Sequence, residues 1–208
     1  AQTHFEPGIY RIRLLYDEHC LRRPKTESRL KIPVQRLDMT PFSLSGNILT
    51  LKNIEEIVFH HRKLVLTPAS KRSMIASLDL LKKWVSEEKT IYGVNTGFGG
   101  LSDIRIPPDK LAKLQLNIVR SHSAGVGAPF DEAEVRTIML LRAQVLANGY
   151  SGVRPRVVTM LLQFLNKNIL PRIPQKGSVG ASGDLAPLAH LALCLIGEGE
   201  VFYQNRQM

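Results

Sequence analysis

The segment Gly177–Leu185 holds three consecutive small residues, Ala181, Ser182 and Gly183, that could form an electrophile from main-chain atoms. Gly183 has no Cβ, so its amide nitrogen can approach the Ala181 carbonyl carbon closely. Attack by that nitrogen and loss of one water would close a five-membered ring. Loss of the Ser182 hydroxyl as a second water would leave an exposed methylene. The product, 4-methylideneimidazole-5-one, is an electrophile that no ordinary side chain supplies.

The same triplet can also be an ordinary turn before a helix, a feature that often binds an anion through its N–H groups. The flanking residues favour the electrophile, because Gly177 and Gly180 alternate with small residues and Asp184 precedes an apolar run. Asp184 would cap a helix that begins at Leu185. The partial positive charge at that helix start would favour movement of electron density into the ring oxygen when a nucleophile adds.

Three ordered segments of the chain resemble the aromatic amino-acid ammonia-lyases and 2,3-aminomutases. They are Tyr92–Gly99, Arg120–Gly127 and Gly177–His190. The resemblance runs from about Leu44 to the C-terminus, and members of this family are considerably longer. It implies a mainly α, helical-bundle fold with long functional loops, of which this chain would be the N-terminal part. It also implies that 4-methylideneimidazole-5-one forms autocatalytically from residues 181–183, with no external cofactor.

Tyr92 stands at the start of a glycine-rich segment, and the resemblance implies that it is the catalytic base. Elimination of ammonia must remove a β-proton of very low acidity, so a base has to lie beside that carbon. A phenol can do this only when a positive neighbour or the substrate ammonium lowers its pKa. Glycines 93, 97, 99 and 100 would let the segment act as a lid that excludes water. The alternative is a half-buried aromatic with its hydroxyl in solvent.

His122 is the candidate specificity residue. The pair Ser121-His122 resembles the histidine ammonia-lyases and some tyrosine 2,3-aminomutases, whereas plant phenylalanine lyases usually have Leu-Asn there and the best-known tyrosine lyases have His-Leu. A histidine at this place can form a hydrogen bond with an imidazole or a phenol. Gly100 occupies the position of a glutamate that is common in the tyrosine aminomutases, which favours a lyase. The alternative for His122 is a bond to a carbonyl at the end of its helix.

The first functional hypothesis is conversion of L-histidine to urocanate and ammonia. The second is a tyrosine or phenylalanine ammonia-lyase or 2,3-aminomutase on the same scaffold, and the third is a truncated chain that is inactive by itself. The resemblance places further site residues beyond Met208, including those that engage the substrate carboxylate. It also implies a homotetramer whose neighbouring subunits complete each site.

Periodicity and end signals predict a helical chain. Residues 1–43 are punctuated by prolines and are predicted to be an irregular extension, with a weak strand pattern at 9–14. Residues 44–208 are predicted to be part of one lyase domain. Within it we expect a strand at 47–51, a loop at 90–103, and a last strand near 200 without a partner. Helices are expected at 54–61, 67–87, 109–122, 131–148, 155–168 and 185–196.

The composition of the chain excludes several other classes of protein. The chain of 208 residues is 44% hydrophobic and 22% charged, with a formal net charge of +10. It shows no zinc-finger spacing and no aromatic-interleaved basic motif, so we expect a basic enzyme surface and no nucleic-acid partner. The longest apolar run is too short for a bilayer, and no secretion signal is visible. Two distant cysteines, Cys20 and Cys194, favour a reducing cytoplasm.

No metal site is expected. His4, His19, Cys20, His60 and His61 are the candidate ligands, and their spacings do not form a tetrahedral set. His190 lies on the apolar face of the helix predicted at 185–196 and is expected to be a core histidine with its hydrogen bonds satisfied.

Overall fold

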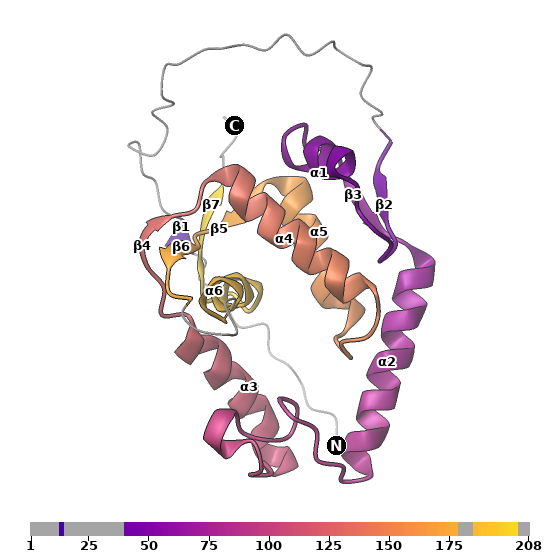
Figure 1. Cartoon of the computed structure of the whole chain (residues 1–208), viewed down its shortest axis with the longest axis vertical. Helices are drawn as coiled ribbons and strands as arrows, with labels where there is room; N and C mark the ends of the chain where they lie inside the picture. Colours follow the sequence, from indigo (N-terminus) through magenta and orange to yellow (C-terminus); the bar gives the residue numbers. More distant parts are fainter. Residues whose placement is uncertain (1–12, 15–39, 179–184, 204–208) are drawn as a thin grey trace.

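The computed structural model describes residues 13–14, 40–178 and 185–203, and within them the chain is mainly helical (Figure 1). The predicted fold class is confirmed. The helices are α1 (Leu51–Val58), α2 (Pro68–Ser86), the short 3-10 helix η2 (Gly99–Leu101), α3 (Pro108–His122), α4 (Glu132–Ala147), α5 (Pro155–Lys167) and α6 (Leu185–Leu195).

The helix boundaries follow the capping residues in the sequence. Thr67 accepts a hydrogen bond from the Ser70 amide at the start of α2, as its position before a proline predicts. Asp131 caps α4 in the same way, and the Glu134 side chain bonds back to the Asp131 amide. These local signals explain why the five helices from α2 to α6 were predicted to within a few residues.

Before α2, the helix expected at 54–61 is present but begins three residues earlier, and the strand expected at 47–51 is wrong. Residues 47–50 form no strand, and α1 begins at Leu51 because Thr50 and Asn53 form a reciprocal cap. The strands here are β2 (Phe42–Leu44) and β3 (Leu64–Leu66), which pair in parallel. Each is only three residues long, too short for an alternation pattern to reveal it.

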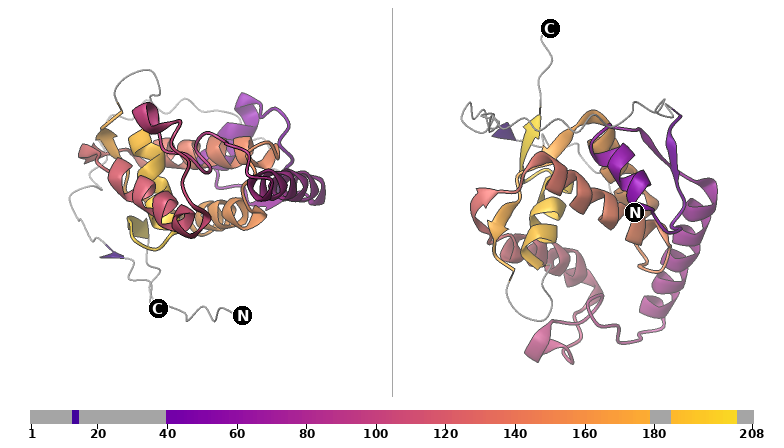
Figure 2. Two further views of the ribbon diagram at one scale, coloured as in Figure 1. Left: turned by 90° about the horizontal axis from the view of Figure 1, so that it is seen from below. Right: turned by 45° about the horizontal axis from the view of Figure 1, so that its top comes forward.

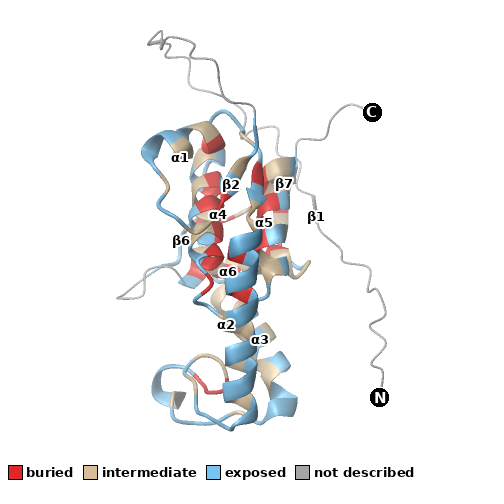
Figure 3. Cartoon of the chain, turned by 90° about the vertical axis from the view of Figure 1, so that its right-hand side faces the viewer, coloured by how far each residue is buried: buried red, intermediate tan, exposed pale blue. Residues whose placement is uncertain are grey.

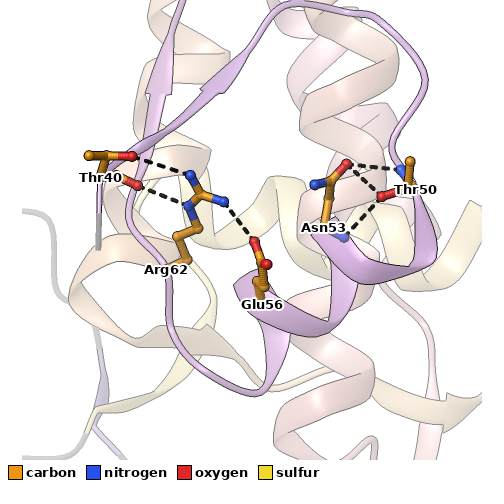
Figure 4. Close-up of polar contacts among 5 residues, drawn as sticks. All are labelled: Thr40, Thr50, Asn53, Glu56 and Arg62. Carbon is orange, nitrogen blue, oxygen red and sulfur yellow. Dashed lines mark hydrogen bonds and ion pairs between the residues drawn. The ribbon is translucent and has the colours of Figure 1, made fainter. Parts of the chain in front are cut away.

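A small polar network ties β2 to the end of α1 (Figure 4). Arg62 donates from Nε to the Thr40 carbonyl at 2.9 Å and from Nη1 to Glu56 Oε2 at 2.6 Å. Its guanidinium also lies 5.6 Å from the centre of the Phe42 ring. One arginine therefore links Thr40, strand β2 and helix α1.

The last strand, β7 (Glu200–Tyr203), was predicted to lack a partner and in fact has two. It pairs antiparallel with β5 (Ile169–Pro171) and parallel with β1 (Arg13–Leu14), in the order β1-β7-β5. The weak strand pattern at 9–14 is confirmed at Arg13 and Leu14. A further pair, β4 (Val126–Pro129) with β6 (Pro174–Lys176), was not predicted and is antiparallel.

The core lies around α4, α5 and the inner faces of α1 and α6. Figure 3 shows buried residues gathered in this upper part, whereas α3 and the loop before it are mostly exposed. α2 and α3 stand at opposite sides of the molecule, joined by residues 87–107 (Figures 1 and 2). The most buried apolar side chains include Leu44, Ile57, Met139, Leu140, Val158 and Ile173.

One charged side chain lies within this core. Arg136 of α4 is 1% exposed. It donates to the carbonyls of Ile57 and Val58 at the end of α1, at 2.8 and 3.0 Å, and to Leu165 at the end of α5, at 3.2 Å. The Ile57 and Val58 carbonyls lie in the last turn of α1, where no amide of the same helix reaches them, and the Leu165 carbonyl also accepts from the Asn168 amide at 3.3 Å. Carbonyls at a helix end carry partial negative charge. Burial lowers the pKa of Arg136, but an arginine remains protonated, so the cation joins two helix ends.

Replacing Arg136 with Met should destabilise the fold strongly. Each buried carbonyl left without a donor costs about 1–3 kcal/mol, and those of Ile57 and Val58 would be left so. We expect a loss of about 2–6 kcal/mol in the free energy of unfolding, measured by denaturant titration. Arg142→Met, at an exposed position of the same helix, is the control and should be nearly neutral. Equal stability of the two variants would contradict this role.

Candidate functional site

The triplet Ala181, Ser182 and Gly183 lies outside the described residues, but the chain on either side of it is well defined. β6 ends at Lys176 and α6 begins at Leu185. A Cβ added to Gly177 would lie 3.1 Å from the Ala186 Cβ. The described chain before the triplet and the described chain after it therefore meet at Gly177 and Ala186.

The chain at Gly177 lies against the second motif. Gly177 has a φ of +151°, and a Cβ there would lie only 2.8 Å from the Gly125 Cα. Only glycine permits both this conformation and this approach of two backbones. His190 of α6 accepts a hydrogen bond at Nε2 from the Gly125 amide, at 3.1 Å. The segments 120–127 and 177–190, far apart in sequence, are thus in contact.

His190 is half-buried and so is not the core residue that was predicted, although its Nε2 does accept a hydrogen bond. Desolvation lowers its pKa, with a further lowering from Arg172 and an opposing effect of Glu200. The neutral ring is the form that can accept from Gly125. This bond therefore contributes stability above the ordinary histidine pKa, and the contribution is lost as pH falls through the lowered value.

His122 is the last residue of α3. Its Nδ1 lies 2.9 Å from the Ile118 carbonyl oxygen and 3.2 Å from Ser121 Oγ. A carbonyl only accepts, so Nδ1 carries the proton in the neutral ring and Nε2 is left as an acceptor. Among the described residues no hydrogen bond reaches that Nε2. His122 therefore forms the hydrogen bond expected at a helix end, through Nδ1, and also keeps Nε2 as an acceptor.

The helix end that carries His122 is joined to the far end of α6. Arg120 donates to both oxygens of Glu198, at 2.8 and 2.6 Å. This hydrogen bond lowers the pKa of the Glu198 carboxyl. The pair is exposed, so its contribution is to geometry more than to stability. It links α3 to the chain just after α6.

Tyr92 projects from the loop between α2 and α3. Its side chain is 64% exposed, and its ring meets Phe98 edge-on at 5.5 Å between centroids. Gly93, with a φ of +73°, turns the chain directly after it. Among the described residues the Tyr92 hydroxyl makes no hydrogen bond.

The structure therefore joins the second and third motifs directly, whereas the first motif contacts α3 through Gln115, before the second motif begins. Tyr92 and His122 both belong to the unit formed by residues 87–107 and α3, although no direct contact joins them. Sequence reasoning missed Asn95 and Gln115, which hold the Tyr92 loop in place. The burial of a polar asparagine inside a glycine-rich loop has no sequence signal.

The described parts of the chain contain no cluster of three or more His, Cys, Asp or Glu that could hold a metal ion. No helix in those parts is long and apolar enough to cross a membrane.

The sequence of this chain matches one protein family over residues 49–208, the aromatic amino acid lyases. The chain belongs to this family. Histidine ammonia-lyase from Geobacillus thermodenitrificans is 48% identical over 165 residues, which are 79% of this chain and 33% of that protein. The chain thus spans about a third of the length of the curated relatives that it matches.

Solved structures of the family share the fold. Tyrosine aminomutase from Streptomyces globisporus superposes with a TM-score of 0.73 at 38% identity, over 81% of this chain and 32% of that one. Histidine ammonia-lyase from Trypanosoma cruzi gives a TM-score of 0.69 at 35% identity, over 80% and 31%. The family membership expected from the three motifs is confirmed, as is the expectation that the chain corresponds to part of a larger fold.

Replacing Gly177 with Ala should disturb its close approach to Gly125. The new Cβ would collide with the Gly125 backbone at 2.8 Å, in a conformation that alanine rarely adopts. We expect a loss of about 1–3 kcal/mol in the free energy of unfolding, measured by thermal and denaturant unfolding. Gly100→Ala is the matched control, since a Cβ there would meet nothing within 4 Å. A Gly177→Ala variant as stable as the control would show that the close approach does not occur.

Proposed function

We propose that the whole protein of which this chain is part eliminates ammonia from an aromatic L-amino acid, with L-histidine as substrate and urocanate as product. The assignment of L-histidine as substrate rests on the 48% identity to histidine ammonia-lyase, together with His122. The chain covers only a third of such relatives, so the proposal concerns the whole protein. We expect these 208 residues alone to be inactive.

The proposed electrophile is 4-methylideneimidazole-5-one, formed from Ala181, Ser182 and Gly183. When formed, it would supply an electron-poor methylene that takes up electron density from the substrate. The approach of Gly177 to Ala186 supports this assignment, because it brings together the described chain on the two sides of the triplet. Attack of the Gly183 nitrogen on the Ala181 carbonyl needs the two ends of the segment to be held close together, as Gly177 and Ala186 are.

In this proposal Tyr92 removes the β-proton of the substrate. Its hydroxyl is exposed and free of hydrogen bonds to the described residues, so it can reach a bound amino acid. The glycine-rich segment that follows Tyr92 would act as a lid that covers the substrate and excludes water. His122 binds the substrate side chain, because its Nε2 can accept a hydrogen bond from an imidazole N–H.

His122 Nε2 could equally accept a hydrogen bond from a phenol, so tyrosine is a second candidate substrate. The likeness to a tyrosine aminomutase, at 38% identity, favours tyrosine as the alternative substrate. Gly100, at the place where the tyrosine aminomutases commonly carry a glutamate, favours elimination over 2,3-migration of the amine.

The whole protein is proposed to act as a homotetramer, with residues 1–43 as an extension outside the lyase domain. The deciding experiment supplies it with L-histidine, L-tyrosine and L-phenylalanine separately. Appearance of urocanate absorbance with histidine alone is the expected result. Turnover of tyrosine without turnover of histidine would overturn the substrate assignment, and a β-amino acid product would identify a mutase.

A further inference from the structure

We propose that Asn95 and Gln115 are positioning residues for Tyr92: Asn95 closes the turn that presents it, and Gln115 fastens that turn to the helix carrying His122. The proposal rests on the role of Tyr92 in the proposed function. It adds two residues that touch neither the triplet nor the expected substrate.

Asn95 is 2% exposed, although the loop around it is largely exposed (Figure 3). Its side chain is fully engaged within the loop. Oδ1 accepts from the Ile91 amide at 2.7 Å, and Nδ2 donates to the Lys89 carbonyl at 2.7 Å. The Asn95 carbonyl also accepts from the Ile106 amide at 2.8 Å, on the returning strand of the loop. One amide side chain thus binds the chain before Tyr92 to the chain after it.

The turn closed by Asn95 spans residues 91–95, and Tyr92 lies inside it. The Asn95 amide also donates to the Ile91 carbonyl, at 3.2 Å. The next residue, Thr96, is completely buried and accepts at Oγ1 from the Gly93 amide. The backbone of the turn is thereby fixed on both sides of Tyr92. Within the described residues, the interaction of the Tyr92 side chain is its ring contact with Phe98.

Gln115 fastens this turn to α3. Its Nε2 lies 3.2 Å from the Gly93 carbonyl oxygen and 3.4 Å from that of Val94, the two residues that follow Tyr92. Gln115 and His122 are seven residues apart on one helix, so they lie on nearly the same face, about 10 Å apart along the axis. The bond from Gln115 therefore places the Tyr92 turn on the face of α3 that also bears His122.

Ammonia elimination would require a fixed distance between Tyr92 and His122. A base and a side-chain anchor must meet the same substrate, and a displacement of 1 Å can cost about 10²-fold in rate. Gln115 is exposed, so its two bonds add little to global stability. Loss of these bonds should therefore change the reaction without unfolding the protein.

The test replaces Gln115 with Met in the whole protein, with Asn117→Met as the control. Asn117 is also an exposed amide of α3, two residues further along the helix. Gln115→Met should lower kcat between about tenfold and 10²-fold, change KM less, and leave the unfolding temperature unchanged. Asn117→Met should match the wild type. Equal kcat in the two variants, or a loss explained by unfolding, would overturn the proposal.

A second measurement is independent of activity. Amide hydrogen exchange reports the loop directly, because the Ile91 amide donates to Asn95 Oδ1. Asn95→Ala should remove protection at Ile91, whereas Asn95→Asp keeps that acceptor and should retain it. If the whole protein eliminated no ammonia, the proposed function would fail, but loss of protection over 91–97 in Gln115→Met would still establish the fastening. Unchanged exchange in both Asn95→Ala and Gln115→Met would refute it.

Discussion

Replacing Ser182 with Ala in the whole protein should abolish ammonia elimination. Alanine has no hydroxyl to lose as the second water, so the exposed methylene of the proposed ring cannot form. The remaining side chains cannot substitute for it, because ordinary residues offer nucleophiles and acids but no comparable electrophile. The expected loss exceeds the roughly 10²–10⁴-fold that removal of a single acid–base group causes.

Two measurements test this prediction. The first is the rate of product formation, and the second is the mass of the peptide that contains residues 181–183. In the wild type this peptide should be lighter than its sequence by two water molecules, and Ser182→Ala should not show that double loss. Ser178→Ala alters an exposed serine shortly before the triplet and should retain both activity and mass deficit. A wild-type peptide of unmodified mass would eliminate the proposed electrophile.

Replacing Tyr92 with Phe should lower kcat by about 10²–10⁴-fold with a much smaller change in KM. The phenylalanine ring keeps the edge contact with Phe98 and removes only the hydroxyl that would take the β-proton. The hydroxyl makes no hydrogen bond among the described residues, so the variant should fold normally. Ring formation at residues 181–183 should also be unaffected.

The measurement is steady-state kinetics of the whole protein combined with a thermal unfolding curve. Tyr150→Phe provides the control, because Tyr150 is another exposed tyrosine, at 91%, outside the three motifs. It should keep wild-type kcat. A Tyr92→Phe variant with normal kcat would assign the base to another residue, and a large rise in KM alone would make Tyr92 a binding group.

Local sequence signals were sufficient to predict where the helices begin and end. Thr67 before Pro68, Asp131 before Glu134, and Pro155 at a helix start each satisfy or remove unpaired amides within a few residues. The apolar periodicity then extends each helix to its end. These effects act over one or two turns, so a single sequence contains them completely. The family followed from three motifs for the same reason, since each is contiguous.

The strands and their pairing could not be predicted in this way. β2, β3, β5 and β6 have three residues each, and their stability comes from partners that lie far away in sequence. β7 was expected to be unpaired because its partners, β1 and β5, come from distant parts of the chain.

For the candidate site too, residue types could be read from the sequence but contacts between distant segments could not. The residues that could supply an electrophile, a base and a side-chain anchor are recognisable before folding, because that chemistry belongs to the residue types. The folded chain is needed to show that Gly177 meets Gly125, that His190 accepts from the Gly125 amide, and that Gln115 donates to the turn bearing Tyr92. These are contacts between segments separated by tens of residues, and chain folding alone brings them within hydrogen-bonding distance.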